Sequence, residues 1–452
     1  MKSIFLEKTF YIETYGCTAN VSDSERMISI LLEKKWIQKQ SLEEAELCII
    51  NSCGVKDPTE KKILKRIKNI NSMHQKHLII TGCLPAMIKE KIRKAAPNFG
   101  AMFGTRSTHL LGSVIERLIS GEINIELFSR ISEAQNKIQT LPVMNHNPVV
   151  GILTISEGCD GACTFCGTKI ARGKTISYDP ESLLSQAKSF LKNGAKFLWV
   201  TSQDTGAYRW ISSNMHWEAP ELMQALCHLP YQYRVRIGMI NPQHVSQFAD
   251  RFINLFKNNP NLFQFAHIPI QSGNNRILEL MNRNNSVQEF ENSLKNLRAS
   301  LPDITISTDV IVGFPTESDN DFQDTVDLIG RIKPDVLNIS RYGARPRTKA
   351  AMMKDQIHGA ISKERSRTLT SYWVDLMNPL SKKRWIGWEG SVFVEQAGHK
   401  PKNDGTPTVI ARNFSYRPII LPKNQLNLGD QVYVRIIDAN VHYLTAVGVN
   451  DN

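Results

Sequence analysis

The chain has 452 residues, and at about 150 residues per domain this length predicts about three domains. Hydrophobic residues make up 41% and charged residues 22%, as in ordinary globular proteins, and eight cysteines are too few for a disulfide scaffold of this length. No apolar run of about 18 residues could span a bilayer, and Glu7, Lys8 and Glu13 make the N-terminal segment a poor signal peptide. We therefore expect a cytoplasmic protein without a membrane partner, in which clustered cysteines are metal ligands or catalytic thiols.

Basic residues outnumber acidic ones, 55 against 43, which gives a formal net charge of +12. Such an excess favours a polyanionic partner, either nucleic acid or an acidic membrane surface. Because the basic residues are spread widely along the chain, a compositional bias without a partner is the alternative interpretation.

The first hundred residues alternate strand and helix patterns three times. Strands are expected at residues 9–17, 47–53 and 77–83, and the last residue of each is a cysteine. Alternating strands and helices imply a parallel sheet, whose strand ends lie along one edge. The three cysteines are therefore expected to converge, beside helix N-termini whose dipoles favour a bound anion.

The starts of these helices are predicted from capping patterns. Ser22 and Glu25 form a capping-box pattern, which predicts that the first helix begins after Ser22. Asp57 is the expected N-cap of the second helix, and Pro85 is expected to begin the third.

From Gly151 onward strands and helices alternate again. Six strand–helix units follow, fewer than the eight of a complete (β/α)8 barrel, so a partial (β/α)6 barrel is predicted. Barrel folds place their active sites at the strand ends. Here these positions carry polar residues, namely Gln203, Asp204, Asn241, Gln271, Ser272, Asp309 and Arg345.

From about Trp385 the pattern changes to short alternating segments with turns, one of them at Gly429–Asp430, which predicts a small antiparallel β-barrel. The predicted fold class is therefore α/β, in three domains. A parallel-sheet α/β domain is expected at 8–118, the partial barrel at 145–378 and the small β-barrel at 380–450.

The segment EGCDGACTFCGTKIARG begins at Glu157 and holds Cys159, Cys163 and Cys166, separated by three residues and then by two. Structural zinc takes four ligands, and this loop supplies three cysteines and no histidine. A [4Fe–4S] cluster held by three thiolates instead leaves one iron open to another ligand. The spacing, with the aromatic Phe165 before the last cysteine, resembles that of radical S-adenosylmethionine enzymes.

A second candidate ligand set consists of Cys17, Cys53 and Cys83, each at a strand end beside Gly or Ser. Free cysteines are often ordinary buried residues, and we expect Cys48 and Cys227 to be of that kind. Three cysteines at neighbouring strand ends favour a ligand triad. Such a triad would hold a second cluster, again with one open iron.

Over residues 8–449 the sequence resembles the radical S-adenosylmethionine methylthiotransferases. The segments that carry the likeness are ETYGCTAN, NSCGVKDPTEKKILKRI, TGCLPAM, EGCDGACTFCGTKIARGKTISY, TSQDTGAY, HIPIQSGNNRILELMNR and TDVIVGFPTES. CTFCGTKIARGKTISY, TSQDTGAY and RIGMINP are most similar to the archaeal and eukaryotic branch, and the terminal β-barrel resembles the TRAM domain of that family.

The resemblance implies a reaction. Members of this branch convert N6-threonylcarbamoyladenosine at position 37 of tRNA, next to the anticodon, to its 2-methylthio derivative. S-adenosylmethionine would serve both as methyl donor and as the source of a 5′-deoxyadenosyl radical that takes hydrogen from adenine C2. Two [4Fe–4S] clusters are implied, with sulfur presented on the auxiliary cluster at Cys17, Cys53 and Cys83. No catalytic side chain beyond the cluster ligands is expected.

The same resemblance implies further site residues and partners. Contacts to S-adenosylmethionine are expected from an aromatic residue of the cysteine loop and from polar residues at the strand ends: Phe165, Gln203, Asp204, Gln271, Ser272 and Asp309. Gln203 stands where such enzymes place a contact to the methionine amino group, and an ordinary loop residue is the alternative. The expected partners of a monomeric chain are the tRNA anticodon stem-loop, an electron donor and a sulfur source.

Two stretches are candidates for RNA contact. Arg412, Phe414, Tyr416 and Arg417 interleave cations with aromatic rings, which suits phosphate contact with base stacking, although core aromatics on an ordinary strand would look the same. The second stretch is the basic face of a helix, more often solvated than bound to RNA, with Lys61, Lys62, Lys65, Arg66 and Lys68.

Four alternatives stay open. Methylthiotransferases of sibling branches act on isopentenyladenosine in tRNA or on a ribosomal-protein aspartate. An iron–sulfur RNA-binding sensor without catalysis would need no S-adenosylmethionine. A zinc-dependent RNA-binding protein would hold zinc in place of iron and sulfide.

Overall fold

A computed structural model describes residues 7–54, 57–73, 77–128, 147–213, 215–398, 401 and 405–449. The chain forms two compact units. Unit 1 comprises Met1–His146, Thr154–Leu183 and Gly343–Met352, and unit 2 comprises Asn147–Leu153, Leu184–Tyr342 and Met353–Asn452. Among the described helices, none combines the length and the apolar character that a membrane crossing requires.

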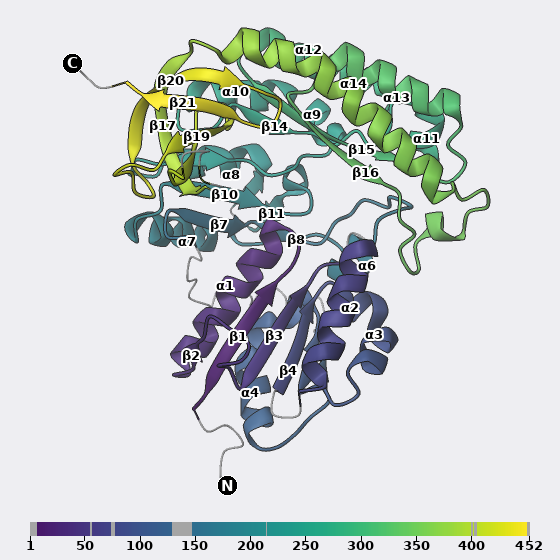
Figure 1. Cartoon of the computed structure of the whole chain (residues 1–452), viewed down its shortest axis with the longest axis vertical. Helices are drawn as coiled ribbons and strands as arrows, with labels where there is room; N and C mark the ends of the chain where they lie inside the picture. The colour runs from purple at the N-terminus through teal and green to yellow at the C-terminus, as the bar shows by residue number, and fades with distance from the viewer. Residues whose placement is uncertain are drawn as a thin grey trace. The chain divides into compact units, whose positions relative to one another are not determined.

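Unit 1 is built on a parallel sheet of six strands in the order β2-β1-β3-β4-β5-β6 (Figure 1). These are β1 (Thr9–Thr14), β2 (Ile37–Gln38), β3 (Leu47–Ser52), β4 (His77–Gly82), β5 (Ala101–Phe103) and β6 (Ile125–Leu127). Because β1, β3 and β4 are neighbours and run in the same direction, their C-terminal ends share one edge. The parallel-sheet prediction is confirmed.

Helices cover both faces of this sheet. On one face lie α1 (Thr18–Glu33), η1 (Thr105–Leu110) and α4 (Leu111–Ile119), and on the other lie α2 (Asp57–Asn71) and α3 (Leu84–Ala95). Successive side chains of β3 point to opposite faces of the sheet and therefore pack against different helices.

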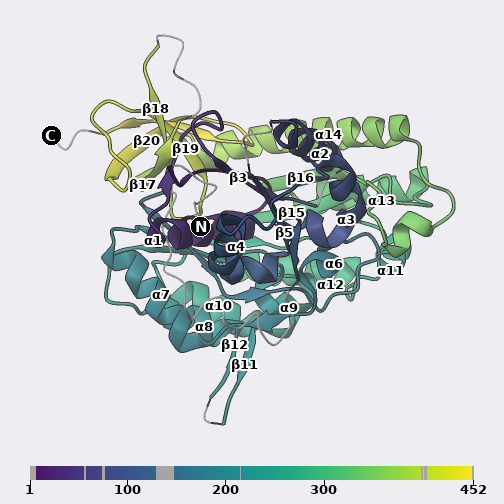
Figure 2. The ribbon, with the colours of Figure 1, turned by 90° about the horizontal axis from the view of Figure 1, so that it is seen from below.

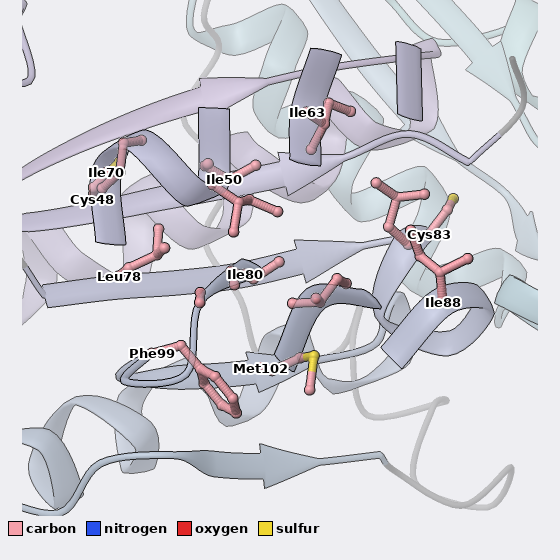
Figure 3. Close-up of a cluster of buried hydrophobic side chains, with 14 of the residues drawn as sticks. Cys48, Ile50, Ile63, Ile70, Leu78, Ile80, Cys83, Ile88, Phe99 and Met102 are labelled. Carbon is pink, nitrogen blue, oxygen red and sulfur yellow. The ribbon is translucent and has the colours of Figure 1, made fainter. Parts of the chain in front are cut away.

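Leu47 and Ile49 pack against α1 and α4, whereas Cys48 and Ile50 pack against α2 and α3. Figure 3 shows Cys48 among aliphatic side chains, far from Cys83 at the strand ends. Cys48 is fully buried, as expected of a core thiol.

The three helix starts differ from the capping predictions. Helix α1 begins at Thr18 with Cys17 as its N-cap, so Ser22 and Glu25 are buried inside the helix. Neighbouring polar groups in the helix make tertiary contacts instead, as when Ser24 Oγ bonds the Thr14 hydroxyl at 2.7 Å. Helix α3 likewise begins at Leu84, one residue before Pro85 and directly after its N-cap Cys83, and α2 begins at Asp57 itself.

Unit 1 also contains four short elements from later in the chain. Strands β8 (Ser156–Glu157) and β9 (Ile176–Ser177) pair antiparallel, and helix α6 (Thr168–Arg172) lies between them in sequence. The fourth element is η4 (Lys349–Met352). The segment with Cys159, Cys163 and Cys166 therefore belongs to the same compact unit as the first sheet.

Unit 2 contains six parallel strands in two three-stranded sheets, ordered β13-β10-β7 and β14-β15-β16. They are β7 (Val150–Thr154), β10 (Phe197–Thr201), β13 (Arg234–Arg236), β14 (Phe265–His267), β15 (Thr305–Val312) and β16 (Val336–Arg341). A parallel bridge between Val235 and Leu262 joins the two sheets, which confirms the partial (β/α)6 barrel.

Helices connect these strands. They are α7 (Pro180–Lys192), α8 (Ala219–Cys227), α9 (Pro242–Gln247), α10 (Ala249–Asn258), α11 (Asn275–Leu280), α12 (Val287–Ser300) and α13 (Asp319–Ile332). The sequence reading missed one hairpin, formed by β11 (Arg209–Ile211) and β12 (His216–Glu218).

The long helix α14 (Gly359–Trp385) leads into a closed five-stranded barrel, yellow in Figure 2. Its strands are β17 (Glu389–Ala397), β18 (Thr408–Arg412), β19 (Pro418–Pro422), β20 (Gln431–Ala439) and β21 (Leu444–Gly448). The predicted barrel is confirmed, with one difference. Strands β19 and β21 pair parallel, because the chain crosses over before closing the barrel.

Candidate functional site

Unit 1 brings Cys17, Cys53 and Cys83 together at the C-terminal edge of its sheet. The loops that carry them pack closely: a Cβ on Gly16 would lie 2.9 Å from Cys53 Sγ, and a Cβ on Gly54 would lie 3.3 Å from Cys83 Cβ. Glycine is required where thiol-bearing loops approach so closely, and Gly16 also has a φ of +109°. The convergence that the topology predicts is present; we call these residues the edge triad.

The three cysteines of the edge triad differ in solvent exposure, and burial shifts the pKa of one of them. Cys17 is exposed, whereas Cys53 and Cys83 are buried. Burial raises the pKa of the Cys83 thiol to about 11, the guanidinium of Arg172 opposes this shift, and the thiols of Cys17 and Cys53 add to it. Because metals bind thiolates, binding at this edge must release protons.

Asn20, in the first turn of α1, ties the loops of the edge triad together. Its side-chain amide donates to Tyr15 O at 2.7 Å and to Ser52 O at 3.0 Å, while Asn51 Nδ2 donates to Asn20 O at 2.7 Å. The Oδ1 atom of Asn20 lies 3.9 Å from Cys17 Sγ. One side chain thus fixes the loops that follow β1 and β3.

A cation is buried next to this edge. Arg172, the last residue of α6, is only 2% exposed. Its Nη1 donates to Glu157 Oε1 at 2.6 Å, and its Nη2 donates to Asn20 Oδ1 at 2.6 Å and to Asp23 Oδ2 at 3.1 Å. The positive charge also acts on the thiols of Cys83 and Cys17. Two carboxylates compensate a charge that would otherwise be costly to bury.

The second cysteine set lies in the loop between β8 and β9. The amide of Cys159 donates to Gly173 O at 3.0 Å, which closes the loop at its base. A Cβ on Gly161 would lie 3.2 Å from Cys159 Sγ and 3.9 Å from Cys163 Sγ, so both sulfurs face the same glycine. The amide of Thr168 donates to Cys166 Sγ at 3.4 Å. We call this set the loop triad.

Met87 of α3 fills the space between the two cysteine-bearing loops. A Cβ on Gly54 would lie 2.3 Å from its Sδ, and a Cβ on Gly167 would lie 2.4 Å from its Cε. Nearby, the guanidinium of Arg345 is paired with the buried carboxylate of Glu60 on α2. The loops after Cys53 and Cys166 are therefore packed against one thioether inside one unit.

Both triads fit a [4Fe–4S] cluster bound by three thiolates. Each offers three thiols beside glycines, and an amide and a buried cation lie next to sulfur, as suits an anionic cluster. Within the described ranges, no three His, Cys, Asp or Glu side chains are grouped to hold a single metal ion.

The strand-end residues predicted to contact S-adenosylmethionine lie in unit 2, apart from Phe165, which is half-buried in the loop of unit 1. Asp204 is 4% exposed and is held by Asn241, whose Nδ2 donates at 2.6 Å, and by His244 Nε2 at 3.2 Å. Gln203, the residue before it, is half-buried. The carboxylate of Asp204 therefore has hydrogen-bond partners within unit 2.

Gln271, which follows β14, lies beside Asp309, which is inside β15 and not at its end. The amide of Gln271 donates to Asp309 O at 2.9 Å, and Gln271 has a φ of +79°. The Asp309 carboxylate contacts His267 Nε2 at 3.0 Å and accepts a bond from Asn338 Nδ2 at 2.7 Å. Ser272 is fully buried. A role of these residues in binding S-adenosylmethionine stays a prediction.

The four terminal residues predicted to contact RNA make internal contacts. Arg417 is 2% exposed and donates to the backbone oxygens of Asp335, Asn440 and Val441 at 3.0–3.2 Å. Arg412 stacks over the Tyr416 ring at 4.3 Å and donates to Glu395 Oε2 at 2.7 Å.

The two aromatic members of that set are also internal. Burial and the carboxylate of Glu395 raise the pKa of Tyr416 to about 12. Phe414 packs in the barrel core with Trp385 and Trp388. The RNA contact of this stretch stays a prediction. Lys400 and Lys402, two further basic residues near it in sequence, lie outside the described residues.

The basic face of α2 borders a groove along β1, with a volume of about 600 Å³. Its lining comprises Tyr11, Ile12, Glu13, Thr14, Tyr15, Lys62, Lys65, Arg66 and Asn69. Arg66 is paired with Glu13 at 2.6 Å, whereas Lys62 and Lys65 are exposed and Lys62 Nζ lies 5.9 Å from the Tyr15 ring centre. The groove ends at Tyr15, two residues before Cys17.

Sequence reasoning missed Arg172, Asp23, Asn20 and Met87. One signal was available for the polar members: the first turns of α1 read TANVSDSER, with almost no apolar periodicity, although the helix is buried on most sides. A buried helix with this sequence must place polar side chains against other polar groups inside the protein. Nothing in the sequence marks Arg172 as the partner, because the contact spans more than a hundred residues.

Models of known families match both units. The model described as "Uncharacterized protein family UPF0004" matches residues 9–104, and the model of the radical SAM superfamily matches residues 153–329. The first match covers the sheet with the edge triad, and the second covers the loop triad and most of the barrel strands.

A relative from Pyrococcus horikoshii, named "Probable threonylcarbamoyladenosine tRNA methylthiotransferase", is 37% identical over 96% of this chain and 98% of its own. The chain belongs to this family. The Homo sapiens threonylcarbamoyladenosine tRNA methylthiotransferase is 32% identical over 98% of this chain and 74% of its own length. Family membership thus extends over both triads and the terminal barrel.

Solved structures support the fold of this family member. The radical S-adenosylmethionine methyltransferase TsrM from Kitasatospora setae aligns with a TM-score of 0.56 at 10% identity, over 76% of this chain and 75% of that one. The radical enzyme OxsB aligns with a TM-score of 0.52 at 12% identity, over 81% of this chain and 56% of that one. At such identities the likeness concerns the fold alone.

Proposed function

We propose that this chain is a tRNA methylthiotransferase that converts N6-threonylcarbamoyladenosine at position 37 to its 2-methylthio derivative. The observation that carries this proposal is the presence of two separate cysteine triads in one compact unit, in a chain whose relatives of that name match it from end to end. The family uses S-adenosylmethionine and [4Fe–4S] clusters, and the chain has the residues to hold both clusters.

In this proposal the loop triad, Cys159, Cys163 and Cys166, holds the cluster that binds S-adenosylmethionine. The edge triad, Cys17, Cys53 and Cys83, holds the auxiliary cluster. When bound, the clusters and S-adenosylmethionine supply the electron, the radical and the methylated sulfur that replacement of the C2 hydrogen by a methylthio group requires.

The side chains of the chain hold and shield these groups. Asn20 fixes the loops around the edge triad, and Met87 keeps water from the space between the two cysteine-bearing loops. The thioether side chain is unbranched and packs in irregular gaps, which suits a place between two loops. Strand-end residues of unit 2, Gln203 and Gln271 among them, are proposed to contact S-adenosylmethionine.

For the RNA we propose contact along the groove between β1 and α2. Lys62 and Lys65 are exposed there, and Tyr15 offers a ring next to the edge where the sulfur has to be delivered. Cations beside an aromatic ring suit a single-stranded loop, which combines phosphates with unstacked bases. The anticodon stem-loop is therefore the proposed ligand of this face. A cytoplasmic monomer that draws on an electron donor and a sulfur source completes the proposal.

Nucleoside mass spectrometry tests this function. tRNA from a strain lacking the gene is expected to lose the 2-methylthio derivative and to accumulate N6-threonylcarbamoyladenosine, and the wild-type gene restores it. A variant with alanine at the edge triad, expressed at the same level, is expected not to restore it. Unchanged tRNA nucleosides together with an unmodified ribosomal-protein aspartate would instead point to the sibling reaction.

A further inference from the structure

One buried cation and two buried carboxylates lie beside the edge triad, and holding a cluster by three thiolates does not require them. Arg172 comes from the helix that follows the loop triad, yet its guanidinium lies among residues of α1 at the edge triad. It is fully enclosed, and so are the carboxylates of Asp23 and Glu157. These three charges are therefore screened weakly by solvent.

The contacts of Arg172 connect the two cysteine sets. Its Nη1 is bound by Glu157, two residues before Cys159, and its Nη2 reaches Asn20, whose Oδ1 lies 3.9 Å from Cys17 Sγ. The same positive charge counters the burial that disfavours a thiolate at Cys83. Arg172 thus faces two members of the edge triad while remaining fixed to the strand before the loop triad.

We propose that Arg172 is a positioning residue that sets the reduction potential of the auxiliary cluster and locks the loop triad to the edge triad. This inference rests on the proposed function, because it requires a cluster at Cys17, Cys53 and Cys83. It assigns to one buried side chain a role that neither the cysteine spacing nor the family likeness specifies.

The electrostatic argument has a definite sign. Reduction adds one negative charge to a cluster, and a nearby cation that water does not screen stabilises the reduced form, which raises the reduction potential. Replacing Arg172 by a neutral residue removes that cation together with its ion pairs to Asp23 and Glu157. The loss of positive charge lowers the potential. Neutralising Asp23 instead removes a negative charge, and should raise it.

A purely structural role is the competing explanation, and the chain offers a matched control. Arg106 is also buried, donates to Lys174 O at 2.6 Å and packs against Gly173, so it ties η1 to the segment that follows α6. None of its described hydrogen bonds reaches the edge triad. If Arg172 acted only by holding the segment, Arg106→Gln and Arg172→Gln would change the cluster alike.

The experiment is a redox titration of the auxiliary cluster followed by electron paramagnetic resonance, without tRNA. The full-length chain carries alanine at Cys159, Cys163 and Cys166, so that one cluster remains. In this background Arg172→Gln is expected to lower the equilibrium constant for reduction at least tenfold, a shift of about 59 mV to more negative potential for one electron. Arg172→Lys is expected to retain most of the wild-type value, and Arg106→Gln to change the constant less than twofold.

Asp23→Asn provides a second arm with the opposite sign. This variant is expected to shift the reduction potential to more positive values. If Arg172→Gln fails to fold, Asp23→Asn alone tests the electrostatic effect on the cluster. An unchanged or more negative potential in Asp23→Asn, or equal shifts in Arg172→Gln and Arg106→Gln, would overturn the inference. If the alanine background itself held no cluster, the proposed auxiliary site would fail and the inference with it.

Discussion

Two buried arginines in different regions of the molecule have different kinds of partner. At the edge of the first sheet, Arg172 is paired with two buried carboxylates and faces cysteine thiols. In the terminal barrel, Arg417 is paired with backbone carbonyls. Carbonyl acceptors satisfy a cation and fix the loops that carry them. Carboxylates beside thiols create an electric field at the proposed cluster site, so the partners of a buried arginine indicate its role better than its burial does.

The largest effects are expected from the cysteine triads themselves. Alanine at the edge triad should abolish methylthio transfer while leaving reductive cleavage of S-adenosylmethionine to 5′-deoxyadenosine, because only the auxiliary cluster is lost. Alanine at the loop triad should abolish both. Chromatography of the nucleosides from one reconstituted reaction measures both products.

Cys227→Ala serves as the control for these variants. Cys227 is buried in α8, and burial raises the pKa of its thiol to about 12, so it remains a neutral core residue. The control should retain both activities. Loss of 5′-deoxyadenosine formation in the edge-triad variant would contradict the division of labour between the triads.

Arg417 distinguishes a structural arginine from an RNA ligand. Arg417→Ala removes a buried cation from three carbonyl oxygens and should lower local stability by about 2–4 kcal/mol. Hydrogen exchange of the amides in β19 and β21 measures this loss. At a temperature where the variant stays folded, its affinity for tRNA should equal that of wild type. A weaker affinity in the fully folded variant would restore the RNA role predicted for this stretch.

Substitution of Gly16 tests whether the loops that carry Cys17 and Cys53 must pack this closely against each other. Gly16→Ala would place a Cβ 2.7 Å from Cys53 Cβ in addition to the strain of its positive φ, so we expect a cost of about 1–3 kcal/mol and a loss of auxiliary iron. Gly121→Ala is the matched control, since Gly121 has a φ of +93° and nothing within 4 Å of the added Cβ. The control should keep its iron; equal iron contents in the two variants would show that close approach is not needed.

The smallest expected effect concerns the groove along β1. If about five phosphates are neutralised, the logarithm of tRNA affinity should fall with the logarithm of salt at a slope of roughly −3 to −5. Replacing Lys62 and Lys65 by glutamine should make this slope shallower by about 1.4–1.8. Replacing the exposed Lys363 of α14 should leave it unchanged. An unaltered slope in the double variant would mean that this basic face is merely solvated.

The arrangement of strands was predictable because local pattern determines it. Alternating strands and helices require a parallel sheet, and this alone brings Cys17, Cys53 and Cys83 to one edge. The loop triad was evident from spacing. The closed terminal barrel followed from short alternating strands, although the parallel pairing of β19 with β21 did not.

What could not be predicted depends on long-range contacts. Ser22 and Glu25 match a capping pattern but are buried within α1, because tertiary burial overrides a local signal. Arg412 and Arg417 look like RNA ligands in sequence, and only the structure shows that they also have internal acceptors, at Glu395 and at the backbone of Asn440. The pairing of Arg172 with Asp23 is likewise invisible until the two segments are seen together.

Anaerobic measurement of iron and sulfide tests the central claim most directly. The wild-type chain is predicted to bind about eight irons with a matching amount of sulfide, and each triple-alanine variant about four. A wild-type content of about four irons, lost completely in one variant and unaffected in the other, would mean a single cluster and would contradict the two-site account.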